Sequence, residues 1–174
     1  MKVQFLLALM ILATFAVHAQ TIDADKSGVT FTILERKDKK TVNGSFGGMR
    51  GEVNFKPDDL ENSSFKVCIS ANTVVTGLKI RDKQLNKDEF FHTEVYPDIC
   101  FASSTISETT EGYVTKGILT VREISRELEI PFTFENNTLR GSLSIDRLDY
   151  KLGEKFTPKK MAALAKVEIV CVLK

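Results

Sequence analysis

The sequence predicts an all-β protein of about eight antiparallel strands, arranged as a sandwich or a closed barrel. Three observations support this prediction. Apolar and polar residues alternate with a period of two in many short runs, which is typical of strands with one buried face. Clusters of polar turn residues separate these runs. One segment in the middle of the chain departs from the alternation and has helical spacing instead.

Apolar residues at every second position locate the predicted strands. In the first half of the chain these positions are Val29, Phe31 and Ile33, then Gly51, Val53 and Phe55, then Phe65, Val67, Ile69 and Ala71. Residues 113–121 form one long predicted strand, and the later stripes are Leu128, Ile130, Phe132 and Phe134, then Leu139, Gly141, Leu143 and Ile145, then Val167, Ile169, Cys171 and Leu173. Polar turns between the runs favour hairpin connections.

One short helix is predicted near residues 78–86. Helical spacing places four residues of this segment on one face, and these are Leu78, Arg81, Asp82 and Leu85. The helix is expected to end before Phe90. Residues 159–166 are also compatible with a second helical turn, after which the last strand is expected to start at Val167.

Residues 1–19 are predicted to be a cleaved export signal. Met1-Lys2 supplies a positive charge, an apolar run follows, and Val17-His18-Ala19 resembles a signal-peptidase site. The apolar run is shorter than the ~20 residues that a membrane-spanning helix needs. The mature chain is therefore expected to be one domain, residues 20–174, in the periplasm or secreted.

Charge and composition exclude several function classes. The sequence has 24 Lys and Arg against 23 Asp and Glu, and the loss of Lys2 with the signal leaves the two signs equal. This balance gives no basic footprint for nucleic acid. His92 is the one histidine outside the signal, and no nucleophile elbow, P-loop or metalloprotease motif is present. No metal site or enzyme cofactor is predicted.

The three cysteines, Cys68, Cys100 and Cys171, all lie in strand-like runs. Alternation places Cys68 and Cys100 opposite the apolar stripes of their strands, whereas Cys171 shares the stripe of the last strand. A disulfide between Cys68 and Cys100 is compatible with this pattern. The residues alone favour free buried thiols, because unpaired cysteine is among the most buried residue types.

Four segments of the sequence together form a recognisable signature. The longest is Thr76-Gly77-x3-Arg81-Asp82-x2-Leu85-x4-Phe90-Phe91-x4-Tyr96-Pro97-x-Ile99-x-Phe101-x-Ser103. The others are Ile22-Asp23-x3-Ser27-x-Val29-x-Phe31, Gly117-x-Leu119-Thr120-Val121-Arg122-x-Ile124-Ser125-Arg126 and Asp146-Arg147-Leu148-Asp149-Tyr150. This signature closely resembles that of the YceI-like, polyisoprenoid-binding family, and the resemblance covers essentially all of residues 20–174.

The resemblance implies an extended, eight-stranded, antiparallel, lipocalin-like β-barrel that is exported to the bacterial periplasm. It also implies a long apolar ligand in the barrel lumen, such as a polyprenyl chain, an isoprenoid quinone or a fatty-acid amide. Such a lipid would be a ligand held for transport or storage, and no enzymatic activity is expected.

Twelve apolar residues that are in phase with the predicted strands are candidates for the wall of the lumen. They are Phe31, Ile33, Phe46, Val53, Phe55, Val67, Ile69, Phe101, Leu119, Val121, Phe132 and Phe134. From the residues alone, a solidly packed core is favoured, because side chains can fill a small eight-stranded barrel. The family resemblance favours a lumen that holds a ligand.

The candidates for the mouth of the barrel are Arg81, Asp82, Phe90 and Phe91. The Arg81-Asp82 pair could contact a polar headgroup, although an ion pair or a helix cap is the commoner use of such residues. The two phenylalanines are interpreted either as packing or as a lid. The basic run at 36–40 is expected to be a solvated hairpin tip, with transient contact to an anionic membrane surface as the alternative.

The sequence leaves two other function classes open. A barrel with a filled core would act as an interaction module through its outer surface. An enzyme that acts on lipids is disfavoured, because no acid, base, nucleophile or metal cluster stands out. The sequence leaves the oligomeric state open, a homodimer included.

Overall fold

The computed structural model describes residues 20–35 and 39–174, and these residues form nine strands and one α-helix. The strands are β1 (Gly28–Glu35), β2 (Lys40–Phe46), β3 (Arg50–Asn54), β4 (Ser64–Ser70), β5 (Asp98–Thr109), β6 (Gly112–Val121), β7 (Ile124–Glu135), β8 (Thr138–Asp146) and β9 (Met161–Val172). The helix is α1 (Lys79–Leu85), and two short 3-10 helices cover Ala71–Thr73 and Arg147–Tyr150.

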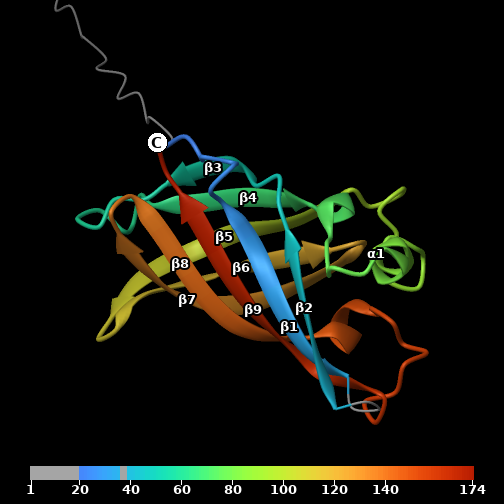
Figure 1. Ribbon diagram of the computed structural model, residues 1–174. Coiled ribbons are helices and arrows are strands. Elements are labelled where there is room, and N and C mark those ends of the chain that lie inside the picture. The colour runs from blue at the N-terminus through green and yellow to red at the C-terminus, as the bar shows by residue number, and fades with distance from the viewer. Residues whose placement is uncertain (1–19, 36–38) are drawn as a thin grey trace, which may run out of the picture.

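All nine strands belong to one sheet in the order β2-β1-β9-β8-β7-β6-β5-β4-β3. Every pair of neighbours is antiparallel. The sheet curls into a half-barrel, with α1 beyond the ends of β4, β5 and β6 (Figure 1). The predicted all-β antiparallel architecture with one short helix is therefore confirmed, and the described chain has one strand more than expected.

The sheet is loosest between β7 and β8. β7 pairs with β6 from Val121↔Ile124 to Tyr113↔Phe132, but it pairs with β8 only over the four residues Phe132–Glu135. The remaining part of β8 pairs with β9 as far as Asp146. The two strands therefore diverge toward the end of the half-barrel where α1 lies (Figure 1).

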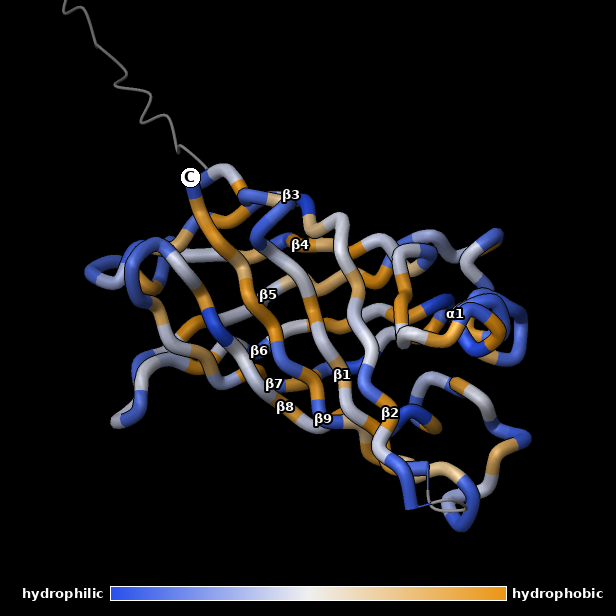
Figure 2. Tube along the Cα trace, viewed as in Figure 1, coloured by the Kyte–Doolittle hydropathy of each residue, from blue (hydrophilic) through white to orange (hydrophobic). Residues whose placement is uncertain are grey.

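The period-two alternation produces these strands as predicted. In β7, Leu128, Ile130, Phe132 and Phe134 are buried or half-buried, while the residues between them are exposed. Along the strands in Figure 2, apolar residues alternate with polar ones, and the hairpin tips are hydrophilic. Because successive side chains of a strand point to opposite faces, this pattern puts one apolar face inside the curl.

The predicted helix near residues 78–86 is confirmed as α1, Lys79–Leu85. Its start is defined by a turn in which Gly77 has φ 77°, a conformation that costs glycine little. Asn86 ends the helix, and its backbone N–H still bonds to the carbonyl of Asp82 at 3.3 Å. Phe90 follows outside the helix, as expected.

The expectation of a helical turn within residues 159–166 is wrong. A turn precedes Met161, and β9 begins at that residue, where Met161 pairs with Glu35 of β1. From Leu164 onward the strand also pairs with β8. Two neighbouring strands thus supply hydrogen-bond partners for this segment, and pairing on both sides outweighs the weak helical preference of its alanines and lysines.

Cys68 and Cys100 form a disulfide, so the preference for free thiols at these positions is wrong. The two residues lie directly opposite each other on the antiparallel strands β4 and β5, with their Cα atoms 4.1 Å apart. Such closely opposed pairs bring two Cβ atoms near enough to be bridged. Cys171 is the third cysteine, and it is free and buried.

The buried side chains form two neighbouring clusters inside the curl. The larger one is centred on Val53, whose exposed fraction is 0%. The smaller one contains Phe90, Val121, Tyr150 and Leu152, and Leu85 of α1 packs against it. Apolar side chains therefore cover the concave face of the sheet as far as α1.

The predicted export signal at residues 1–19 lies outside the described residues. In the part of the chain that is described, no helix has the length and apolar character needed to cross a membrane.

Candidate functional site

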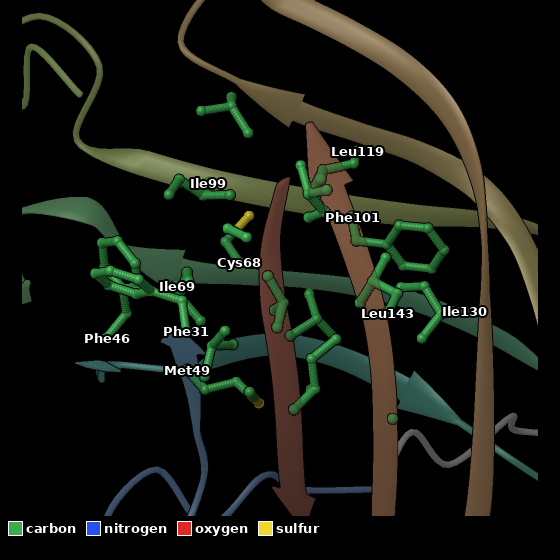
Figure 3. A pocket seen from close by; sticks show the side chains of 18 of the residues that line it. Phe31, Phe46, Met49, Cys68, Ile69, Ile99, Phe101, Leu119, Ile130 and Leu143 are labelled. Carbon is green, nitrogen blue, oxygen red and sulfur yellow. The ribbon is translucent and has the colours of Figure 1, made fainter. Parts of the chain in front are cut away.

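An apolar cavity lies inside the half-barrel. Its volume is about 270 Å³, and all nine strands contribute to its wall. Figure 3 shows the cavity with side chains such as Phe31, Phe101 and Leu143 around it, and the labelled side chains carry only carbon and sulfur. These labelled side chains offer no hydrogen bonds to water, which is typical of a site for an apolar ligand.

Ten of the twelve residues that the sequence assigns to the lumen line this cavity. They are Phe31, Ile33, Phe46, Val53, Val67, Ile69, Phe101, Leu119, Val121 and Phe132. They come from β1–β7, and the curl of the sheet turns their common face toward one space.

Phe55 and Phe134, the other two, lie outside the cavity wall and belong to an aromatic cluster. The centroid of the Phe55 ring is 5.1 Å from that of Phe134, 5.1 Å from Tyr113 and 5.4 Å from Phe132, all in edge-to-face arrangements. Rings in this geometry fill the interior between β3 and β7. Alternation identifies residues that point inward, but it does not separate those that line a cavity from those that pack solidly.

Of the four predicted mouth residues, Phe90 and Phe91 line the cavity. Phe91 packs edge-to-face on Phe46 with ring centroids 5.2 Å apart, and Phe90 lies 5.7 Å from Phe156. Phe90 is 7% exposed, so it closes this part of the wall from within. The two rings therefore join the segment after α1 to β2 and to the loop between β8 and β9.

Arg81 and Asp82 do not belong to the cavity wall. One carboxylate oxygen of Asp82 accepts hydrogen bonds from the backbone N–H of Thr76 at 2.8 Å and from its hydroxyl at 2.6 Å. Asp82 thus fixes the turn that leads into α1. Asp82 therefore stabilises the local structure, and neither Arg81 nor Asp82 reaches the cavity.

Arg147 lines the cavity and fixes the loop between β8 and β9. It is 5% exposed, and its guanidinium donates only to backbone carbonyls. The acceptors are the carbonyls of Ala162 at 3.0 Å, Leu152 at 2.6 Å, Gly153 at 2.8 Å, Met161 at 3.3 Å and, at short range, Phe156. Burial lowers the pKa of this guanidinium from its ordinary value. All its N–H donors have backbone partners, so Arg147 stabilises the part of the wall that the loop between β8 and β9 forms.

Burial shifts the pKa of two more titratable groups of the wall further above neutral pH. Burial raises the pKa of the Tyr150 phenol to about 12 and that of the Cys171 thiol to about 11. Both groups line the cavity. Thr115, the remaining hydroxyl of the wall, donates to the carbonyl of Thr105 at 3.1 Å. At neutral pH the interior thus offers one buried charge, the guanidinium of Arg147, and its donors are occupied.

The described residues contain no group of three or more His, Cys, Asp or Glu side chains arranged to hold a metal ion. The apolar wall of the cavity is suited to the binding of apolar groups.

The antiparallel half-barrel with its apolar cavity agrees with the family to which the sequence can be assigned. The sequence model of the YceI-like domain family matches residues 20–173. The chain belongs to the YceI-like family. This family has a binding-protein fold and is not a known enzyme family.

Curated relatives of this YceI-like chain include the UPF0312 protein of Yersinia enterocolitica, which is 30% identical over 93 residues, 53% of this chain and 46% of that protein. A UPF0312 protein of Photorhabdus laumondii is 29% identical over 83 residues, 48% of this chain and 43% of its own length. The chain thus spans about half the length of the curated relatives that it matches.

Solved structures of other bacterial proteins share the fold of this chain. BcnA of Burkholderia cenocepacia matches with a TM-score of 0.76 at 23% identity, over 86% of this chain and 98% of BcnA. A polyisoprenoid-binding domain of Saccharophagus degradans, implicated in plant cell wall breakdown, matches with a TM-score of 0.66 at 15% identity, over 88% and 96% of the two chains. At these identities, the likeness concerns the fold alone.

Sequence reasoning missed several residues of the wall. Leu143, Ile145, Val167 and Ile169 share the apolar stripes of their strands, so alternation alone could have found them. Met49 lies in the turn between β2 and β3, where no periodicity signals a buried position. Arg147 and Tyr150 are in the last signature segment, and their types gave no sign of an apolar environment. Cys68 also belongs to the wall, although alternation places it opposite the stripe of β4.

Proposed function

We propose that this YceI-like protein holds the apolar chain of a long lipid in its cavity, for transport or storage. The expected ligands are an isoprenoid or polyprenyl chain, an isoprenoid quinone or a fatty-acid amide. The observation that carries this proposal is the apolar cavity of about 270 Å³, whose wall has few polar side chains and no unpaired charge among the described residues. Each methylene removed from water contributes about 0.8 kcal/mol, so such a cavity binds a long chain without any directional contact.

Two further observations support the proposal. A structural neighbour from Saccharophagus degradans is a polyisoprenoid-binding domain. β7 and β8 pair over four residues only, and their unpaired parts carry Ile130, Leu143 and Ile145 of the cavity wall.

We also propose that the protein acts outside the cytoplasm, after removal of residues 1–19. The Cys68–Cys100 disulfide supports this location, because structural disulfides persist in oxidising compartments. The apolar character of residues 3–17 and the small residues before Gln20 are consistent with export.

Lipid transfer would bring one end of the half-barrel to a membrane surface. Lys39 and Lys40 at the β1–β2 hairpin are exposed, and so are Lys159 and Lys160 before β9. The pairing of Glu35 with Met161 brings these two segments together. We therefore expect the protein to float with vesicles that contain anionic lipid at low salt, and not with neutral vesicles. Exchange of these four lysines for glutamate should abolish the flotation, because the attraction is electrostatic. Equal binding to both vesicle types would contradict this expectation.

Native mass spectrometry tests the main proposal. Residues 20–174 would be purified from an exporting bacterial host without detergent. We expect a stoichiometric adduct that releases an isoprenoid or fatty-chain lipid on denaturation. A protein that remains free of ligand after incubation with quinone and polyprenyl lipids would overturn the proposal and favour an interaction module that uses the outer surface.

A matched pair of variants connects the adduct with the cavity. Leu119 lines the cavity, whereas its neighbour Ile118 on β6 is 40% exposed on the outer face. Leu119→Trp fills part of the cavity, so we expect it to lose the adduct. Ile118→Trp adds the same ring outside and should keep the adduct. Circular dichroism of both variants would show whether the fold is intact, and an unchanged adduct in a folded Leu119→Trp protein would contradict an internal site.

A further inference from the structure

Large apolar side chains are exposed in one short stretch of the chain, at the start of α1. Among the described residues, seven large apolar side chains are exposed, and three of them, Val75, Leu78 and Ile80, lie within six consecutive positions. Ile80 is 78% exposed, more than any other large apolar side chain of the described residues. Single exposed apolar residues are normal, whereas neighbouring ones mark a surface that contacts a partner.

The exposed charges beside these apolar residues are basic. Over residues 79–87, the exposed charged side chains are Lys79, Lys83 and Lys87. The one acid of this stretch, Asp82, is half-buried, and its carboxylate accepts two hydrogen bonds from Thr76. The exposed acids Asp88 and Glu94 follow only after the helix. The outer face of α1 thus combines aliphatic side chains with cations, and we define the α1 patch as Leu78, Lys79, Ile80, Lys83 and Lys87.

The inner side of the same segment belongs to the cavity. Leu85 of α1 lines the cavity, and so do Phe90 and Phe91, which follow the helix. Leu78 and Ile80 do not line it, and both are exposed. The helix therefore has one side on the cavity wall and its apolar outer side in water.

The basic hairpin and the loop between β8 and β9 lie at the same end of the half-barrel as α1 (Figure 1). The backbone N–H of Gly153 in this loop donates to the carbonyl of Glu89, just after α1, at 2.7 Å. The loop leads to Met161, which pairs with Glu35 at the β1–β2 hairpin. The exposed lysines of the hairpin and the loop, which we expect to meet an anionic membrane, thus lie at one end of the molecule with the α1 patch.

We propose that the α1 patch docks on an anionic membrane, with Leu78 and Ile80 inserted among the lipids and the lysines of the patch at the phosphates. On such a surface the aliphatic groups leave water while the cations meet the headgroups. A second copy of the chain fits the patch less well, because a two-fold contact would bring like charges together. The inference rests in part on the proposed lipid-binding function, since a lipid carrier has to meet a membrane to exchange its ligand.

Tryptophan fluorescence tests this insertion directly, because the sequence contains no tryptophan. Ile80→Trp would be mixed with vesicles of phosphatidylcholine and phosphatidylglycerol, and with vesicles of phosphatidylcholine alone. Ile118→Trp is the matched control, since Ile118 is an exposed isoleucine on the outer face of β6. With the anionic vesicles, we expect the emission of Ile80→Trp to shift to shorter wavelengths and to be quenched by lipids that are brominated in their acyl chains. Ile118→Trp should show neither effect.

Vesicle flotation provides a second readout, without an added aromatic ring. The double variant Leu78→Ser/Ile80→Ser should bind the anionic vesicles at least about tenfold more weakly, because two aliphatic side chains no longer leave water on docking. Ile118→Ser should bind them as the wild-type protein does. Unchanged binding of the double variant would overturn the proposal.

The outcomes separate docking through α1 from lipid binding in the cavity. If the emission of Ile80→Trp does not change with anionic vesicles while the wild-type protein carries a lipid adduct, the docking proposal is wrong and the proposed function stands. Equal shifts in the two tryptophan variants would indicate general adsorption, and a shift that grows with protein concentration in the absence of vesicles would indicate a second copy as the partner. Either result would overturn the proposal. Insertion by a protein that takes up no lipid would support docking and contradict the function of the cavity.

Discussion

At the scale of single residues, Arg147 is an unusual choice for an apolar wall. A buried cation is costly unless its donors are satisfied, and here carbonyls of the loop after Tyr150 and of the start of β9 satisfy them. The side chain thereby ties residues far apart in the loop to the end of β8. This clamp accounts for the arginine in the Asp146-Arg147-Leu148-Asp149-Tyr150 segment.

Arg147→Met should lower the free energy of unfolding by about 2–4 kcal/mol, because it leaves several buried carbonyls without a donor. Urea denaturation would measure the effect. Arg140→Met is the matched control, since Arg140 is exposed on β8, and it should cost less than about 0.5 kcal/mol. Equal losses for the two variants would show that the clamp contributes nothing.

The raised pKa of Tyr150 predicts how the free energy of unfolding depends on pH in alkaline solution. Burial raises its pKa from 10.0 to about 12, so the folded protein keeps the proton at pH values where the unfolded chain loses it. This contribution to stability is complete below pH 10 and is lost as the pH rises toward 12. Tyr150→Phe should therefore show a shallower loss of stability over this range, measured by urea denaturation at a series of pH values. Identical pH profiles for the variant and the wild-type protein would contradict the burial effect.

At the scale of elements, a disulfide cross-links β4 and β5. The disulfide joins residues 32 positions apart in sequence, and a loop of this length restricts the unfolded chain strongly. The connected strands also carry Ile69, Ile99 and Phe101 of the cavity wall. The cross-link thus stabilises one wall of the cavity.

Replacement of both Cys68 and Cys100 by alanine should lower the free energy of unfolding by about 3–4 kcal/mol. Denaturation with and without reductant would measure this loss. Reductant should destabilise the wild-type protein to the level of the double variant and leave the variant unchanged. A wild-type protein that is insensitive to reductant in its unfolding transition would argue against the disulfide.

The opposite wall is loosened by the divergence of β7 and β8. Their pairing stops at Phe132↔Gly141, and beyond this point Ile130 on one strand and Leu143 and Ile145 on the other face the cavity. The unpaired parts of β7 and β8 thus contribute three side chains to the cavity wall.

At the scale of the whole molecule, ligand binding and folding stability are linked. A lipid that binds only the folded state at 100 times its dissociation constant adds about 2.7 kcal/mol, which corresponds to a rise in Tm of roughly 5–10 °C for a domain of this size. Differential scanning calorimetry with an isoprenoid quinone would detect the rise in Tm. Leu119→Trp should show no shift, and an equal shift in that variant would place the lipid outside the cavity.

The sequence by itself determined which segments form strands and which faces of them are apolar, because a period of two follows directly from strand geometry. It also located α1 from the spacing of Leu78 and Leu85, and the signature segments identified the family. These properties depend on residues near one another in the chain. Ten of the twelve residues that the sequence assigns to the lumen, on strands β1–β7, line the cavity.

Only the tertiary structure decided whether the inward residues pack or line a cavity. Phe55 and Phe101 have the same pattern in sequence, yet one fills an aromatic cluster and the other faces open space. The Cys68–Cys100 bond and the partners of Arg147 likewise depend on contacts between distant segments. Alternation gives the direction of a side chain, but the distance to the opposite wall is set by sheet curvature, strand register and the place where β7 leaves β8.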